Sequence, residues 1–585
     1  MSFWKAFFAS CLGALVAMIL LVVIIISVAT MSGEQEVKVK EGSILRLDLD
    51  APIIEIEKET PFGFSMLGGS SPRPIGLAQL RQTIEHAKED DNIKGIYINV
   101  SIAMTGYTII EEIRQSLLDF RKSGKWVVVY SEMLTESAYY LASAADKIYL
   151  NPEGELEFNG ITAEVSFFKR LFDKLEIKPE VFRVGEFKSA VEPFLLEKMS
   201  AENRLQLNEM INSIYNHVLD QVAAGRKIEK DKLKEIADKM LVRNAKLALE
   251  HGLVDSLLYV DQVELNLKKR VGIESTEKLE FIKYAQYKQS FSTYKDSKNE
   301  VAVIVAEGTI LPGKSEKSNN IIGSESFSKE LKKAREDDDV KAIVIRINSP
   351  GGSFQASDAM WREITLTGKS KPVIASMSDY AASGGYYLAM GCDTIVAQAH
   401  TITGSIGIFS VLFDASGFLN NKIGITSEEI KTGEVGELIT MSRPLTAQER
   451  AIWQTRTEEV YETFTGKAAE GRGMAIDSIK KVASGRVWTG TQAKQRGLVD
   501  IIGSFDDAVQ IAAKTAGVSE DFKVRYYPQY TPSLVEQIIT QIEEEENNTS
   551  LKSELGVYYH LYEYWNTVKT YQGTQARMPY ELKIQ

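Results

Sequence analysis

Glu89-Asp-Asp-Asn-Ile-Lys-Gly-Ile-Tyr-Ile-Asn-Val100 recurs 247 residues later as Glu336-Asp-Asp-Asp-Val-Lys-Ala-Ile-Val-Ile-Arg-Ile347, with six of twelve positions identical. Two further segments recur in the same order and at nearly the same spacing: Ala138–Ile148 as Gly385–Ile395, and Gly252–Asp255 as Gly497–Asp500. Three matches at nearly one spacing are hard to obtain by chance, and repeated sequence is typical of repeated structure. The sequence therefore predicts two tandem copies of one domain.

Each copy alternates short apolar runs with stretches of helical periodicity. The apolar runs lie at Ile93–Val100 and Trp126–Tyr130 in the first copy, and at Val340–Ile347 and Pro372–Ser376 in the second. The stretch Phe327–Glu336 has a helical period and precedes one of these runs. Near-continuous apolar strands that alternate with helices are typical of an α/β fold with a mainly parallel sheet.

The chain has 585 residues, which is too long for one ordinary hydrophobic core, so several domains are expected. We predict a membrane anchor over residues 1–40, a first repeat over 41–283, a linker over 284–300, a second repeat over 301–530 and a C-terminal extension over 531–585. The linker is rich in polar residues, whereas the end of the extension is rich in Tyr and Trp.

The N-terminal segment Phe7–Ala29 carries no charge and is almost entirely apolar. A helix of that length reaches about 35 Å at about 1.5 Å per residue, enough to cross a bilayer core. Lys5 precedes the segment, and Glu34 and Glu36 follow it, which favours a short N-terminus inside and the bulk of the chain outside. A signal peptide cleaved near Ser27–Ala29 is the alternative, although the apolar run exceeds the usual length of such a peptide.

Composition argues against several classes of function. The net charge is −12, so the chain has no basic surplus to neutralise phosphates, and nucleic acid is not expected as a main partner. Cys11 lies in the apolar N-terminal run and Cys392 deep in the chain, which makes a disulfide between them implausible. The five histidines are scattered without the spacing of metal ligands, so no metal site is expected.

The second copy contains a glycine pair that the first copy lacks. Its strand Val340–Ile347 continues into Asn348-Ser-Pro-Gly-Gly-Ser353, and the adjacent Gly351 and Gly352 allow backbone amides to approach a ligand closely. A glycine pair at a strand end predicts an oxyanion hole. A tight turn is the simpler alternative for this motif taken alone.

A serine motif follows in the same copy, in Asp379-Tyr-Ala-Ala-Ser-Gly-Gly-Tyr386. A serine between small residues at a strand-to-helix turn exposes its hydroxyl, and the amide of Gly384 is free to bind an oxyanion. Helix capping by Ser383 is the alternative interpretation. The first copy has Glu136 at the position equivalent to Ser383, so we expect the nucleophile only in the second copy.

We expect the base for Ser383 to come from the first copy. Lys188 lies among apolar residues in Gly185-Glu-Phe-Lys-Ser-Ala-Val-Glu-Pro-Phe194, whereas the second copy has Gly436 at the equivalent position. The two copies are therefore complementary, because one holds the lysine and the other the serine. A free lysine has a pKa near 10.4, so burial must lower this pKa to about 7–8 before the amine can act as a base.

A neutral amine also needs a partner that orients it. Ser405, in Thr403-Gly-Ser-Ile-Gly407, is our candidate for this role. His400 is a weaker candidate for the base itself, because nothing near it in the sequence would orient its ring.

Taken together, these motifs resemble those of signal peptide peptidase A, also called protease IV, in its long duplicated bacterial form. The resemblance extends over about residues 1–530. It implies tandem α/β domains with a ClpP/crotonase-like fold. The implied site consists of Ser383 as nucleophile, Lys188 as general base, Ser405 as the serine that orients the lysine, and Gly351, Gly352 and Gly384 as the oxyanion hole.

The resemblance further implies a membrane-anchored serine endopeptidase that degrades cleaved signal peptides and other apolar peptides without a metal or cofactor. Its implied partners are peptide substrates, the membrane and further copies of the same chain in a homotetramer. The implied location is the bacterial inner membrane, crossed once, with the catalytic part on the periplasmic side.

Two other interpretations remain open at this point. A crotonase-like acyl-CoA enzyme would use the same oxyanion hole, but a membrane anchor and a serine–lysine pair suit it poorly. A non-catalytic membrane scaffold would have no need of both Lys188 and Ser383.

Overall fold

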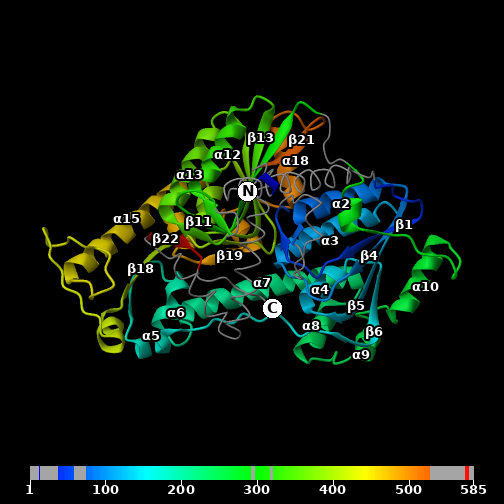
Figure 1. Ribbon diagram of the computed structural model, residues 1–585, viewed down its shortest axis with the longest axis horizontal. Coiled ribbons are helices and arrows are strands. Elements are labelled where there is room, and N and C mark those ends of the chain that lie inside the picture. The colour runs from blue at the N-terminus through cyan, green and yellow to red at the C-terminus, as the bar shows by residue number, and fades with distance from the viewer. Residues whose placement is uncertain are drawn as a thin grey trace, which may run out of the picture.

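The computed structural model describes residues 12–13, 37–57, 74–291, 297–315, 320–527 and 574–578. Two α/β units lie side by side, the first drawn in blue to green and the second in green to orange (Figure 1). Apart from Leu12 and Gly13, the expected anchor at Phe7–Ala29 lies outside the described residues, as does most of the C-terminal extension. Within the described part of the chain, no helix has both the length and the apolar character needed to cross a membrane.

The first unit is built on a six-stranded sheet in which all neighbouring strands are parallel. Its strands, in spatial order, are β8 (Ser256–Leu257), β6 (Lys147–Leu156), β5 (Trp126–Leu134), β4 (Ile93–Asn99), β1 (Ser43–Asp48) and β9 (Phe281–Lys283). Ile96, Ile98 and Val128 in the central strands are fully buried. Burial on both faces explains why these strands are apolar throughout rather than at alternate positions.

The second unit repeats this order strand for strand. The equivalent strands are β20 (Ile501–Ile502), β16 (Thr394–Ala397), β15 (Val373–Ala382), β13 (Val340–Ser349), β10 (Glu300–Glu307) and β21 (Lys523–Tyr527). At the far end of β15, this sheet gains β17 (Ile402–Gly404) and β19 (Val487–Thr489). Because β4 and β13, β5 and β15, and β6 and β16 each begin 247 residues apart, the predicted duplication is confirmed in the fold.

Helices cover the sheets and recur between the units in the same way. The main pairs are α2 (Leu77–Glu89) with α12 (Ser324–Glu336), α3 (Tyr107–Arg121) with α13 (Phe354–Thr367), α4 (Glu136–Ala142) with α14 (Gly384–Ala389), and α7 (Ala201–Arg226) with α15 (Ala447–Arg472). In α12, the buried Phe327, Leu331 and Ala334 follow the helical period and join the core of the second unit. The predicted helix at Phe327–Glu336 is therefore confirmed and begins one turn earlier.

A third sheet joins the two units. Its order is β12 (Ile321–Gly323), β11 (Thr309–Leu311), β14 (Gly351–Ser353), β22 (Thr574–Arg577), β18 (Ile408–Asp414) and β7 (Lys178–Val184). The first unit contributes β7, which pairs antiparallel with β18 along all seven of its residues. The chain that follows β7 is thereby held against the second unit, and it carries Lys188.

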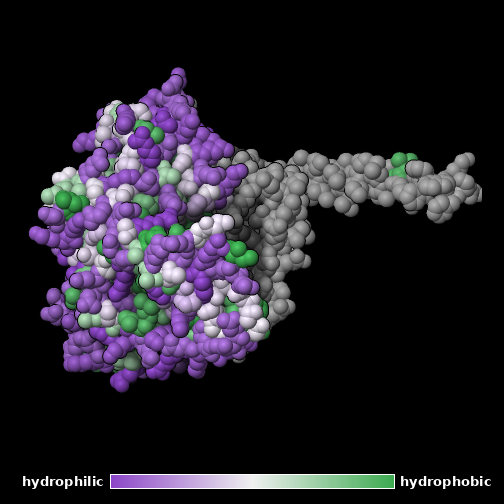
Figure 2. Space-filling model, turned by 90° about the vertical axis from the view of Figure 1, so that its left-hand side faces the viewer, coloured by the Kyte–Doolittle hydropathy of each residue, from purple (hydrophilic) through white to green (hydrophobic). Residues whose placement is uncertain are grey.

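The molecular surface is mainly polar. Figure 2 shows a face on which hydrophilic residues predominate and apolar residues form only small groups. The large apolar side chains are instead collected in separate cores beneath the sheets of the two units. This distribution is ordinary for a folded domain in water.

Candidate active site

Ser383 lies at the sharp turn where β15 ends and α14 begins. Its backbone has φ 55° and ψ −109°, a conformation that non-glycine residues rarely adopt. Its hydroxyl does not cap α14, although the residue occupies the N-cap position, so the predicted alternative of helix capping is wrong. Such strained turns are common where a structure must present a side chain in a defined direction.

Lys188 reaches this serine from the other unit of the same chain. Its Nζ lies 2.8 Å from Ser383 Oγ and 3.0 Å from both the Oγ and the carbonyl oxygen of Ser405. Lys188, Ser383 and Ser405 are all fully buried. One chain therefore brings together the three side chains that the sequence analysis selected, with no second subunit required.

Burial lowers the pKa of Lys188 well below its ordinary value. The charged amine would lose its hydration there, so the neutral form is favoured. The aliphatic part of the side chain packs against two glycines of the second unit: a Cβ on Gly485 would lie 2.6 Å from Lys188 Cβ, and a Cβ on Gly407 would lie 3.2 Å from Lys188 Cδ. A larger residue at either position would push the lysine away from the serine.

Sequence reasoning did not identify Gly485. The available signal was weak, because a glycine next to a serine in Ser484-Gly485 resembles many surface turns. In the structure, Gly485 has φ 77°, and its amide donates to Ile406 O at 2.8 Å. The same turn also holds the segment that carries the lysine, because the amide of Phe187 donates to Ser484 O at 2.9 Å.

Ser405 also has a left-handed backbone, with φ 51°, and its amide donates to Arg486 O at 2.7 Å. This geometry turns both its hydroxyl and its carbonyl oxygen toward Lys188. Ser405 is thus placed to orient the amine, and it does not contact the nucleophile in any hydrogen bond that the structure records.

Replacing Ser405 with alanine is expected to lower kcat about tenfold and to leave KM nearly unchanged. The Ser405 carbonyl still holds the amine, so the loss corresponds to about one hydrogen bond of 1–1.5 kcal/mol. Steady-state kinetics on a peptide substrate measures this separation of kcat from KM. A rise in KM alone would show that Ser405 contributes to substrate binding and does not position the base.

Two of the three glycines expected in the oxyanion hole converge beside Ser383. Gly351 has φ 98°, and a Cβ built on it would lie 2.7 Å from the backbone nitrogen of Gly384. Gly352 instead faces β11, where its Cβ would lie 2.0 Å from Ile310 O. The structure therefore brings Gly351 and Gly384 together, while Gly352 allows close packing of β14 against β11.

His400 lies away from this group. Its Nε2 is 3.2 Å from the hydroxyl of Tyr140, and its ring packs edge-on against His217. Burial lowers the pKa of His400 well below its ordinary value. Among the hydrogen bonds recorded for the described residues, Ser383 Oγ contacts Lys188 and not His400.

Glu111, His217 and His400 offer ligand atoms within 4.8 Å of one another, a cluster that sequence spacing did not reveal. The histidines come from α7 and from the turn before β17, so only the fold brings them together. The Glu111 carboxylate already accepts hydrogen bonds from Gln115, Arg114 and Tyr140. The neighbouring guanidinium disfavours a cation, so the cluster is a poor metal site.

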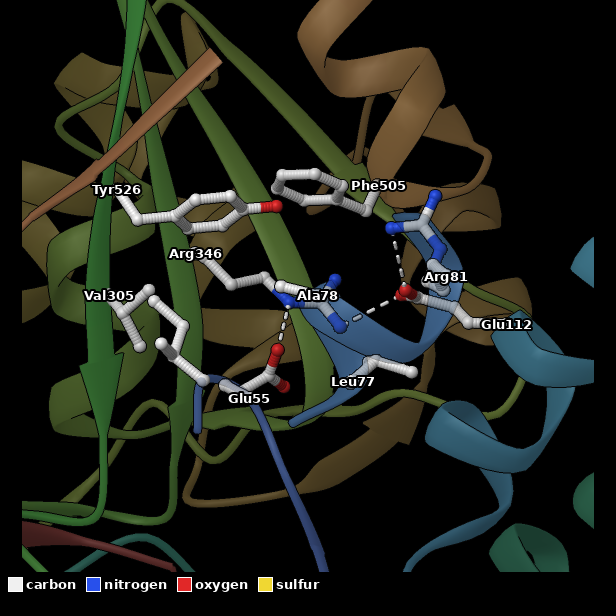
Figure 3. A pocket seen from close by; sticks show the side chains of 10 residues that line it. Glu55, Leu77, Ala78, Arg81, Glu112, Val305, Arg346, Phe505 and Tyr526 are labelled. Carbon is white, nitrogen blue, oxygen red and sulfur yellow. Dashed lines mark hydrogen bonds and ion pairs between the residues drawn. The ribbon is translucent and has the colours of Figure 1, made fainter. Parts of the chain in front are cut away.

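A buried ionic network fixes the two units relative to each other (Figure 3). Arg346 of β13 is only 2% exposed and lies 2.8 Å from both Glu55 and Glu112 of the first unit. Glu112 also lies 3.4 Å from Arg81. The signal in the sequence was Arg346 within the mainly apolar run Val340–Ile347, because a buried charge requires a partner.

Asp379 links the strand of the nucleophile to the first unit. Its carboxylate accepts hydrogen bonds from the backbone amides of Thr108 and Ile109, at 3.0 and 3.4 Å, at the start of α3. Burial raises the pKa of Asp379 to about 6. Since Asp379 lies four residues before Ser383 on β15, this contact positions the serine half of the site against the lysine half.

A buried lysine amine within hydrogen-bond distance of a buried serine, held between two α/β units, is an arrangement that suits a hydrolytic enzyme of the serine peptidase class. Comparison with known sequences agrees, because the model of Peptidase family S49 matches residues 119–274 and 366–519. The chain belongs to peptidase family S49, and it is a serine protease.

Three relatives cover most of the chain. Protease 4 from Haemophilus influenzae is 33% identical over 543 residues, covering 89% of this chain and 88% of that protein. Protease 4 from Salmonella typhi is 34% identical over 523 residues, covering 87% and 83%. The chloroplastic serine protease SPPA from Arabidopsis thaliana is 34% identical over 502 residues, covering 85% and 72%.

Among solved structures, a ClpP1 mutant from Listeria monocytogenes covers 35% of this chain and 94% of its own length, at 17% identity and a TM-score of 0.24. A score at this level carries no argument about the fold. The sequence relatives support the family assignment, and the repeated strand order of the two units supports the duplication.

Proposed function

We propose that this chain is a membrane-anchored serine endopeptidase that uses a Ser383–Lys188 dyad to degrade cleaved signal peptides and other apolar peptides at the bacterial inner membrane. The observation that supports the dyad most directly is the 2.8 Å contact between Lys188 Nζ and Ser383 Oγ. Both side chains are fully buried, and the pKa of the lysine is lowered by that burial. A neutral amine within hydrogen-bond reach of a serine is the arrangement that nucleophilic catalysis requires.

In the proposed mechanism, Lys188 takes the proton of Ser383 while Oγ attacks the carbonyl carbon of the substrate. The backbone amides of Gly351 and Gly384 would stabilise the negative charge that develops on the carbonyl oxygen. Lys188 then donates its proton to the leaving amine, and water hydrolyses the acyl-enzyme with the same amine as base. Ser405 would hold the amine in place through both steps.

The membrane part of the proposal is supported by the uncharged segment at residues 7–29. A tether of this kind would keep the enzyme beside apolar peptides that remain in the bilayer. The fold would be of the ClpP/crotonase-like type, which the repeated parallel sheets suit.

The proposal includes assembly into a homotetramer. The segment between β18 and α15 exposes several large apolar side chains, among them Ile430 at 98% and Ile439 at 63%. Exposed apolar groups on one segment are typical of an interaction surface. Contact between copies of the chain would remove them from water.

A fluorophosphonate probe tests the proposed activity on the full chain in detergent. We expect the probe to label Ser383, as located by peptide mass spectrometry, and to stop hydrolysis of a synthetic signal peptide in proportion to labelling. Phosphonylation requires an activated serine, whereas a crotonase-like enzyme would turn over an acyl-CoA thioester and remain unlabelled. Labelling elsewhere, or peptide hydrolysis that survives complete labelling of Ser383, would refute the proposal.

A further inference from the structure

Lys188 lies on a short irregular segment of the first unit. It comes directly before the 3₁₀ helix Ser189–Val191, which is followed by the single turn of α6 (Glu192–Leu195). A side chain on such a segment keeps its direction only where neighbouring elements fix the backbone. For Lys188, the beginning of α7 supplies contacts of this kind.

Gln206 of α7 binds the chain on both sides of Lys188. Its Nε2 donates to the carbonyl oxygen of Phe187 at 3.1 Å and to the hydroxyl of Ser189 at 2.7 Å. Its Oε1 accepts a hydrogen bond from the backbone amide of Val487 at 3.2 Å. The residue is 1% exposed, and hydrogen bonds in such a buried position are costly to lose. One side chain therefore connects the lysine segment of the first unit to the second unit.

Val487 belongs to the half of the site that holds the serine. It begins β19 and pairs with Gly404 of β17. The carbonyl of Gly404 accepts a hydrogen bond from the amide of Ser383 at 2.8 Å, and Ser405 follows next in the chain. Figure 1 shows α7 and β19 next to each other, where a helix of the first unit meets the sheet of the second. Gln206 thus links the backbone beside the base to the strands that hold the nucleophile.

A buried polar network fixes Gln206 in turn. Asn203, one turn earlier in α7, accepts hydrogen bonds through Oδ1 from Gln206 at 3.2 Å and from Ser189 at 3.0 Å. Its Nδ2 donates to Glu192 at 2.9 Å, and Glu192 also accepts from the hydroxyl of Ser200, the N-cap of α7. A buried network whose members bond to one another favours a single arrangement.

We propose that Gln206 is a positioning residue of the peptidase, which fixes the Lys188 segment against β19 so that the amine stays within reach of Ser383 and shielded from water. The proposal rests on the Ser383–Lys188 dyad proposed above. A base must lie within hydrogen-bond reach of the proton that it takes, and a displacement of about 1 Å can cost about 100-fold in rate. Without the Gln206 contacts, the segment could shift and water could reach the amine. Because hydration favours the charged form, the lowered pKa of Lys188 would then rise toward its ordinary value.

Gln206→Leu in the full chain tests this proposal, since leucine fills most of the same space without an amide. We expect kcat to fall about 10- to 100-fold with KM nearly unchanged, because the change displaces the base and leaves the groups that bind the peptide in place. We also expect the midpoint of the rise of kcat/KM with pH to move upward by about one unit. Steady-state kinetics over a pH series, on a synthetic peptide that the wild type cleaves, measures all three quantities.

Gln398→Leu is the matched control. Gln398 is also buried, and it also joins the two units, because its Nε2 donates to Glu112 at 2.7 Å. Among the hydrogen bonds recorded for the described residues, none connects Gln398 to the Lys188 segment. We expect both leucine variants to melt at a lower temperature than the wild type. Only Gln206→Leu should change the midpoint of the pH profile, whereas Gln398→Leu should keep the kcat and the midpoint of the wild type.

Ser189→Ala is a milder second variant, which decides the question if Gln206→Leu does not fold. It removes one acceptor of the Gln206 amide, so the midpoint should move in the same direction by a smaller amount. Partial unfolding does not shift this midpoint, because only folded molecules contribute to turnover. Unchanged midpoints in the folded variants, together with an inactive Lys188→Met protein, would overturn the role of Gln206 and leave the dyad intact. Wild-type activity in Lys188→Met would instead overturn the dyad, and the role of Gln206 with it.

Discussion

Replacing Ser383 with alanine is expected to lower kcat for peptide hydrolysis by a factor on the order of 10⁴ or more. In the proposed mechanism this hydroxyl forms the acyl-enzyme, so its removal would abolish nearly all covalent catalysis. Serine and alanine both carry a Cβ, so the strain of φ 55° at this position is expected to be similar in the two proteins. The melting temperature should therefore change little. This result would show that activity is lost through the missing hydroxyl and not through unfolding of the protein.

Ser131→Ala is the matched control for this prediction. Ser131 is also fully buried, and it lies in β5, the strand of the first unit equivalent to β15. Its hydroxyl bonds only to the backbone of Met133 among the contacts recorded for it. The control should retain full activity. Hydrolysis that continues in the Ser383→Ala protein at a rate near that of the control would place the nucleophile elsewhere.

Replacing Lys188 with methionine is expected to lower kcat by 10²–10⁴-fold, on the order of what general-base catalysis contributes. Methionine has a similar volume and fills the space against Gly407 and Gly485 without an amine. The fold should not become less stable, because the uncharged side chain is buried without cost. Activity would thus fall sharply while stability does not decrease. A lysine with only a structural role would not give this combination.

The lowered pKa of Lys188 predicts how both stability and activity change with pH. The pKa of Lys188 is lowered in the folded protein, so between that pKa and the unfolded value near 10.5 the folded state binds fewer protons than the unfolded state. The contribution of Lys188 to the free energy of unfolding therefore rises with pH across this range and falls as the pH decreases. For the same reason, kcat/KM of the wild type should rise with pH through one ionisation well below 10.5.

Chemical denaturation and kinetics over the same pH series measure both effects. The stability advantage of Lys188→Met over the wild type should grow as pH falls. Lys178→Met is the control, since Lys178 is exposed at the start of β7 and should change neither activity nor the pH profile. A wild-type profile whose only rise has its midpoint near 10.5 would contradict a neutral lysine as base.

The duplication and its strands were predictable from the sequence, because repeated segments and local apolar runs indicate them. Apolar runs such as Val340–Ile347 are strands because a parallel sheet with helices on both faces buries every side chain along the strand. The structure extends the serine strand from Pro372–Ser376 to Ala382, since the small residues of the serine motif continue the pairing with β17. Sequence periodicity alone does not reveal where such a run of small residues ends.

The sequence did not predict which residues pair with each other in the ionic network. Arg346 was visible as a charge in an apolar strand, but its partners Glu55 and Glu112 lie more than 200 residues earlier. The cluster of Glu111, His217 and His400 is similar, because its members share no sequence spacing. Contacts between the two units depend on how they dock, and no local pattern encodes docking.

The sequence by itself determined that two copies of one α/β domain exist and that the serine and the lysine stand in different copies. It could do so because identity between repeats, and departures from it, are properties of the chain alone. Only the tertiary structure decided that Lys188 Nζ meets Ser383 Oγ, through the pairing of β7 with β18. Burial and distance arise when separate segments pack together, and these determine the basicity of the amine.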